Sequence, residues 1–189
     1  MPSDAARAGI MNVLVLGATG SVGRLVVEEA LTRGHRVTAL VRHPEKLGAL
    51  AVRAMEGDAL DAGAVSRAVS GQDAVLYVLG AGNVRRTTLF SESTRILLQA
   101  MNEQKVRRLI CVTGGGAGET KGHGGFLYDR IFFPLFTKHI YADKDVQEAL
   151  IRQSGLDWTI VRPAGFRART PPGPLTVVED VEGVTLTRI

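Results

Sequence analysis

One short stretch, residues 12–23, constrains the fold of this chain more than any other. An apolar run ends at Gly17, two more glycines follow at Gly20 and Gly23, and a helical pattern continues over residues 24–32. A strand, a glycine turn and a helix N-terminus in this order present free backbone N–H groups to an anion such as a pyrophosphate. We expect Gly17 to make the tight turn, Gly20 to let the backbone approach the phosphates, and Gly23 to let helix and strand pack closely.

The spacing of this motif is G-x-x-G-x-x-G, because position 18 is Ala rather than Gly, so it is not the dinucleotide fingerprint G-x-G-x-x-G. An ordinary strand-to-helix turn can also contain three glycines. The strand before and the helix after it are the context that favours nucleotide binding. The residues between the glycines that we expect to join the cofactor site are Thr19, Ser21 and Val22.

Strand-like and helix-like segments alternate along the whole chain. After the first unit, apolar runs of strand length cover residues 36–41, 51–55, 74–79, 109–112 and 158–161. Helical patterns cover residues 61–69, 89–104 and 142–153. This alternation predicts an α/β fold, a Rossmann-type doubly wound parallel sheet with helices on both faces. We expect one domain over residues 11–189, preceded by a flexible tail, residues 1–10.

Length, charge and cysteine content narrow the functional classes. A chain of 189 residues suits one domain. A net charge of +4 is too modest to indicate a nucleic-acid partner, and no apolar run approaches the ~18 residues of a membrane span. The single cysteine, Cys111, excludes an intramolecular disulfide and suits a reducing cytoplasm.

Ligands of such sheets bind beyond the carboxyl ends of the strands, so the residues that follow each strand belong together. Three of these segments are rich in glycine, which suits close approach of a ligand but also ordinary turns. Besides the first motif, the cofactor candidates at this edge are Arg42, Asp58, Leu79, Gly80, Ala81, Thr113, Lys144 and Pro163.

The residue after the second strand indicates which dinucleotide binds. NAD-binding sites normally place a carboxylate there, whereas this chain has Arg42 and no carboxylate before Glu45. A guanidinium suits a ribose 2′-phosphate, and one charge-assisted hydrogen bond corresponds to roughly a tenfold to hundredfold preference for NADPH over NADH. The alternative is an exposed loop arginine, and Arg24 is a weaker second candidate for the phosphate.

Two aspartates follow the third strand. Asp58 can accept a hydrogen bond from the adenine amino group or cap the next helix. Asp61 is better placed for the cap, which leaves Asp58 for the nucleotide.

Four motifs together resemble a known group of proteins. Residues 17–23 (GATGSVG), 39–47 (ALVRHPEKL), 57–58 (GD) and 155–165 (GLDWTIVRPAG) are similar to those of the atypical short-chain dehydrogenase/reductases. The similarity is greatest to NAD(P)H-binding proteins related to biliverdin reductase B/flavin reductase and to NmrA-like regulators. It runs from about residue 11 to residue 166. The resemblance implies a Rossmann-type sheet, NADP as cofactor, and reduction of flavins or other conjugated acceptors.

The chain departs from this family at the catalytic pair. The family's Tyr-x-x-x-Lys is replaced by Tyr141-Ala-Asp-Lys144, one residue shorter, so Ile140 occupies the tyrosine position. Lys144 can still bind the nicotinamide ribose, whereas we expect Tyr141 to point elsewhere on the helix. Thr113 stands at the family's strand-five serine or threonine, where it can touch substrate or nicotinamide, or simply bond its own turn. These three residues are the catalytic candidates.

Relatives of this kind continue beyond a sequence like residues 183–189 into another helix and strand. We therefore expect either a naturally short form or a truncated C-terminus.

More than half of the aromatic residues lie between positions 126 and 141, after a glycine-rich segment, residues 114–125. They can stack on a flat acceptor, or pack against the sheet or a second subunit. His123 and His139 can donate a proton, and no cluster of residues has the spacing of a metal site.

Three functions compete. The first is an NADPH-dependent reductase that transfers hydride to a flavin, quinone or similar small-molecule acceptor. The second is a regulator that senses NADP(H) without turnover, and the third is a sugar-nucleotide epimerase. We also expect a possible homodimer.

Overall fold

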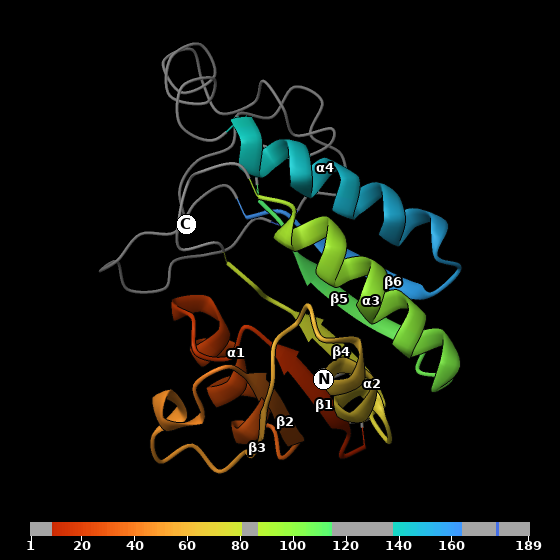
Figure 1. Cartoon of the computed structure of the whole chain (residues 1–189). Coiled ribbons are helices and arrows are strands. Elements are labelled where there is room, and N and C mark those ends of the chain that lie inside the picture. The colour runs from red at the N-terminus through yellow and green to blue at the C-terminus, as the bar shows by residue number, and fades with distance from the viewer. Residues whose placement is uncertain (1–8, 81–86, 115–137, 164–176, 178–189) are drawn as a thin grey trace.

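A six-stranded parallel sheet forms the centre of the computed structural model, which describes residues 9–80, 87–114, 138–163 and 177 (Figure 1). The strand order is β3-β2-β1-β4-β5-β6. The strands are β1 (Asn12–Leu16), β2 (Arg36–Val41), β3 (Arg53–Glu56), β4 (Ala74–Tyr77), β5 (Arg108–Val112) and β6 (Asp157–Val161). The predicted doubly wound α/β sheet is confirmed.

Helices connect the strands as the sequence pattern predicts. They are α1 (Ser21–Thr32), α2 (Ala62–Val69), α3 (Leu89–Glu103) and α4 (Lys138–Gln153), with a short 3₁₀ helix, η2 (Pro44–Leu47). The predicted bounds agree with these to within three residues, except that α4 begins four residues earlier than its pattern. None of the helices within the described ranges is long and apolar enough to cross a membrane.

Successive side chains of each strand point to opposite faces of the sheet, so the core has two layers, one on each face. Val13 and Val15 of β1 pack on one face with Val27 of α1 and Leu47 of η2. Leu14 and Leu16 face the other way, into a larger cluster that contains residues of α2, α3 and α4. In Figure 1, α3 and α4 run side by side over this second face. The sheet therefore has helices on both faces, as predicted.

The strand order changes direction at β1, which is the topological switch point of the sheet. The chain passes from β1 to β2 and β3 on one side, and then crosses over to β4 on the other. The carboxyl ends of β1 and β4 lie together, because the Val78 N–H donates to the Leu16 carbonyl at 2.9 Å. In open α/β sheets the ligand crevice forms at such a switch point.

Cys111 lies in β5 beneath this edge and is completely buried. Burial raises the pKa of its thiol to about 12. At the other end of the chain, only Gly9 and Ile10 of the expected tail lie within the described residues, and both are exposed.

Candidate cofactor site

The turn after β1 requires glycine at position 17. Gly17 has a φ of +96°, and a Cβ built there would lie 2.6 Å from the carbonyl oxygen of Val78. No side chain fits that space, so the ends of β1 and β4 approach each other through bare backbone. The expected tight turn is present.

Gly23 serves the packing of α1 against the same turn. A Cβ at position 23 would run into the carbonyl oxygen of Gly17. The first turn of α1 therefore sits directly on the glycine turn, as we expected from the spacing. Gly20 is the N-cap of α1 with a φ of −75°, so it does not need the left-handed conformation.

Among the described residues, no side chain accepts a hydrogen bond from the N-terminus of α1. Its cap residue is a glycine, and its first turn contains no acidic residue. In contrast, the carboxylate of Asp61 accepts from the N–H groups of Gly63 at 2.8 Å and Ala64 at 3.1 Å at the start of α2. Thr19, Gly20 and Ser21 are exposed and Val22 is half-buried, so an external anion can reach this helix end.

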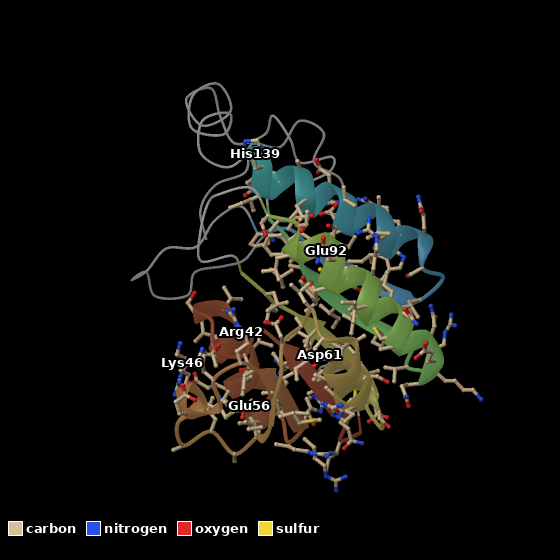
Figure 2. The ribbon with its side chains drawn as sticks, viewed as in Figure 1. Arg42, Lys46, Glu56, Asp61, Glu92 and His139 are labelled. Carbon is tan, nitrogen blue, oxygen red and sulfur yellow. The ribbon has the colours of Figure 1, made fainter. Side chains whose placement is uncertain are left out.

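Arg42 follows β2 at the same edge of the sheet. Its side chain is exposed, and no described residue forms an ion pair or hydrogen bond with its guanidinium (Figure 2). Arg24, the second candidate for a phosphate, instead pairs with Glu28 at 3.2 Å on the surface of α1. Arg42 is therefore the better placed of the two for an external anion.

One of the two predictions for the aspartates after β3 is confirmed, because Asp61 caps α2. Asp58 lies at the same edge, and its Oδ1 accepts from the Leu60 N–H at 2.9 Å and so shapes its own turn. Its bond to the nucleotide stays a prediction.

The candidates that follow β4 and β6 differ in how far they are exposed at this edge. Leu79 is half-buried against the core and Gly80 is exposed, with nothing within 4 Å of the position that a Cβ would take. Pro163 is half-buried just after β6. Ala81 lies outside the described residues.

Helix α4 brings Lys144 to the end of β5. The Lys144 ammonium is buried, donates to the Thr113 carbonyl at 2.7 Å and lies 4.5 Å from the centre of the Phe90 ring. Burial lowers the pKa of Lys144. Lys144 is thus fixed to the β5 backbone at the edge where the sequence places it.

The Tyr141 hydroxyl reaches the same strand end as the Lys144 ammonium, contrary to our expectation that it would point elsewhere. A Cβ built on Gly114 would be 3.2 Å from the Tyr141 hydroxyl, so this hydroxyl lies against the backbone that follows β5. The prediction was wrong because residues three apart on a helix share a face almost as well as residues four apart. Ile140 packs against the core instead.

Thr113 joins a buried ionic cluster that the sequence reasoning missed. Its hydroxyl donates its proton to Glu148 Oε1 at 2.7 Å and not to its own turn. Arg162 donates to both oxygens of Glu148, at 2.8 to 3.3 Å, and Arg152 donates to Oε2 at 3.1 Å. Burial alone would raise the pKa of Glu148, but Arg162, Thr113 and Arg152 lower it on balance. The i,i+4 spacing of Glu148 and Arg152 is the signal that could have revealed the ionic part of this cluster.

A second missed residue, Asp143, joins α4 to α3. Its carboxylate accepts from the N–H groups of Phe90 at 2.8 Å and Ser91 at 3.3 Å, which are in the first turn of α3. Thr88, the N-cap residue of α3, makes no side-chain cap bond. Asp143 thus fixes the start of α3 to the part of α4 that carries Tyr141 and Lys144.

Several candidates on the acceptor side lie outside the described residues. These are the aromatic residues before Tyr141, the glycine-rich segment beyond Gly114, and His123. His139 is exposed in the first turn of α4 (Figure 2). Within the described ranges no group of His, Cys, Asp or Glu side chains could hold a metal ion.

Comparison with known proteins identifies the family. The model of an NAD(P)H-binding family matches residues 17–189, which is most of the chain. The chain belongs to this NAD(P)H-binding family. The bare helix end after β1 and the residues gathered at the carboxyl edge are therefore parts of an NAD(P)H-binding protein.

Individual relatives of this family member differ in their described roles. An uncharacterised sugar epimerase of Bacillus subtilis, YhfK, is 28% identical over 184 residues, covering 91% of this chain and 80% of that protein. The structure of ChuY, an anaerobilin reductase from Escherichia coli O157:H7, is 25% identical with a TM-score of 0.69, covering 82% of this chain and 74% of that chain. A short-chain dehydrogenase/reductase from Veillonella parvula in complex with NADP has the same fold, with 20% identity and a TM-score of 0.69, covering 84% and 71% of the two chains.

Proposed function

We propose that this protein is an NADPH-dependent oxidoreductase that transfers hydride to a flavin, a quinone or a similar conjugated acceptor. One observation carries the proposal: the bare N-terminus of α1 and the buried Lys144 beside Tyr141 lie at the same carboxyl edge of the sheet. The first can hold the cofactor's pyrophosphate, and the second lies where the other half of a dinucleotide would extend. The relation to ChuY, a reductase, agrees with this function.

The chain's own residues mainly bind and orient the reactants. The nicotinamide, when bound, supplies the hydride. Lys144, fixed to the Thr113 carbonyl, is placed to bind the nicotinamide ribose, and the Tyr141 hydroxyl is the candidate proton donor beside it. An acceptor that takes its proton from solvent, such as a flavin, would not need Tyr141.

Arg42 supplies the proposed preference for the phosphorylated cofactor. Its exposed guanidinium follows β2, where the adenine ribose of a bound dinucleotide lies, and no described residue neutralises it. One charge-assisted hydrogen bond contributes about 1.5–3 kcal/mol. We expect Arg42→Asp to reverse the NADPH/NADH preference, because the new carboxylate repels the 2′-phosphate and accepts from the ribose hydroxyl. Calorimetric dissociation constants for both nucleotides measure the change, and unchanged values in the variant would refute this role.

Turnover is tested directly with acceptors. The protein is incubated with NADPH and a panel of flavins, quinones and biliverdin-like compounds, and the absorbance of the nicotinamide band is followed. We expect oxidation with at least one acceptor, and its loss in Lys144→Met. Micromolar NADPH binding without oxidation by any acceptor would contradict the reductase.

That outcome would favour the alternative, a regulator that senses NADP(H). Two observations support it: the Lys144 ammonium is already bonded to the Thr113 carbonyl, and the Tyr–Lys spacing departs from the catalytic pattern of the reductases. Under either function we propose a cytoplasmic location, since the sole cysteine is a buried free thiol.

A further inference from the structure

The Thr113 hydroxyl has only one proton, and Glu148 accepts it. A threonine hydroxyl carries one O–H donor and two acceptor lone pairs. The bond to Glu148 Oε1 is 2.7 Å long, and the Glu148 side chain has no exposed surface. Toward any other group, Thr113 therefore offers only lone pairs.

This polarity depends on Glu148 being ionised. Arg162 uses both Nε and one terminal nitrogen on the carboxylate, and Arg152 adds a further donor at 3.1 Å. Two guanidinium groups around one buried carboxylate hold it in the charged form, which can accept hydrogen bonds but not donate them. The arginines thus fix the direction of the Thr113 bond through Glu148.

Thr113 follows β5, on the β4 side of the switch point. If the adenine half of a dinucleotide lies beside Arg42 and its pyrophosphate at α1, the nicotinamide half extends toward β4 and β5. The nicotinamide carboxamide contains an amino group that donates hydrogen bonds. We propose that Glu148 is a positioning residue that makes the Thr113 hydroxyl an acceptor for this amino group. The inference rests on the proposed cofactor site and adds to it how the nicotinamide ring is oriented.

The variant Glu148→Gln tests the polarity with little change of shape. The new amide has one oxygen and one NH₂ group. The Oε2 position faces terminal nitrogens of both Arg152 and Arg162, which can only donate, whereas the Oε1 position faces Arg162 Nε and the rotatable Thr113 hydroxyl. The amide oxygen is therefore favoured at Oε2, and the NH₂ group then faces Thr113. Thr113 must then accept from the new amide, and its own proton turns outward.

The probes are NADP⁺ and its 3-acetylpyridine analogue, which keeps the carbonyl but lacks the amino group. Calorimetry should show that the wild type binds NADP⁺ about three- to tenfold more tightly, the effect of one neutral hydrogen bond. Glu148→Gln and Thr113→Val should each abolish this preference, whereas Thr113→Ser, which keeps the hydroxyl, should retain it. Thr113→Val removes the hydroxyl without changing the buried charges, so it also serves if Glu148→Gln folds poorly.

A third probe separates this inference from the function on which it rests. The fragment 2′-phospho-ADP-ribose lacks the nicotinamide and should bind the wild type, Thr113→Val and Glu148→Gln alike. If it binds but the two full nucleotides are not distinguished, or if Glu148→Gln weakens all three probes equally, the positioning role is overturned. If it fails to bind the wild type, the proposed cofactor site is overturned as well.

Discussion

At the scale of single residues, two kinds of contact shape the carboxyl edge of the sheet: close backbone packing at the turn after β1 and buried side-chain bonds at the end of β5. The roles of Gly17 and Gly23 follow from a motif in which strand, turn and helix are contiguous, so seven residues contain the information. Tyr141 and Lys144 are three residues apart on α4, and this spacing puts both side chains on one helix face. The hydroxyl of Tyr141 therefore reaches the backbone at Gly114, near the end of β5. The hydrogen bond from Thr113 to Glu148 joins residues 35 positions apart, so no local sequence pattern predicts it.

Gly23→Ala tests the packing of α1 on the glycine turn. The added methyl group would collide with the Gly17 carbonyl, which is backbone and cannot rotate away. We expect the free energy of unfolding to fall by about 1–3 kcal/mol, measured by urea denaturation, with weaker NADPH binding. Gly80→Ala is the matched control for stability, since a Cβ at that position meets no atom of the described residues within 4 Å. Equal stability of the two variants would contradict the close packing.

At the scale of elements, helices predicted from periodicity are present, but only one of two notable caps could be foreseen. Asp61 stands immediately before α2, so its cap is visible in the sequence. The start of α3 is capped by Asp143 from α4, more than 50 residues later in the chain. Such a tertiary cap needs the two helices to be packed first, which is why local reasoning missed it.

Substitution of the two capping aspartates compares their effects. Asp61→Ala and Asp143→Ala should each lower the free energy of unfolding by about 0.5–2 kcal/mol, because helix N–H groups lose their acceptor. Hydrogen exchange at Phe90 and Ser91 should accelerate only in Asp143→Ala. NADPH binding should weaken in Asp143→Ala and stay normal in Asp61→Ala. Protection of these two amides in Asp143→Ala would show that the carboxylate does not hold α3.

At the scale of the whole molecule, the alternation of strands and helices was sufficient to predict the sheet and its ligand-binding edge. The crossover rules leave few topologies for such an order, and the observed one places the glycine turn at the switch point. The acceptor side was not confirmed in the same way, because most of its candidate residues lie outside the described residues. What the structure adds near the end of β5 is the group of buried charges around Glu148.

Those charges give the molecule a defined response to acid. The pKa of Glu148 is lower in the folded protein than its usual 4.5, so the unfolded chain binds more protons between the two values. The stability from Glu148 is therefore complete above pH 4.5 and is lost as the pH falls through the folded pKa. Urea denaturation at a series of pH values should show a steeper acid decline for the wild type than for Glu148→Gln. Parallel curves would contradict this contribution.

Because Cys111 is buried, its modification rate can report local opening of the sheet. The only thiol in the sequence has no exposed surface, and burial raises its pKa to about 12, so a thiol-specific reagent cannot modify it in the closed sheet. Modification then proceeds only through molecules whose β5 has opened. The labelling rate thus measures how often the centre of the sheet opens locally. Any ligand that stabilises the end of β5 should lower this rate, and no engineered probe is needed to detect it.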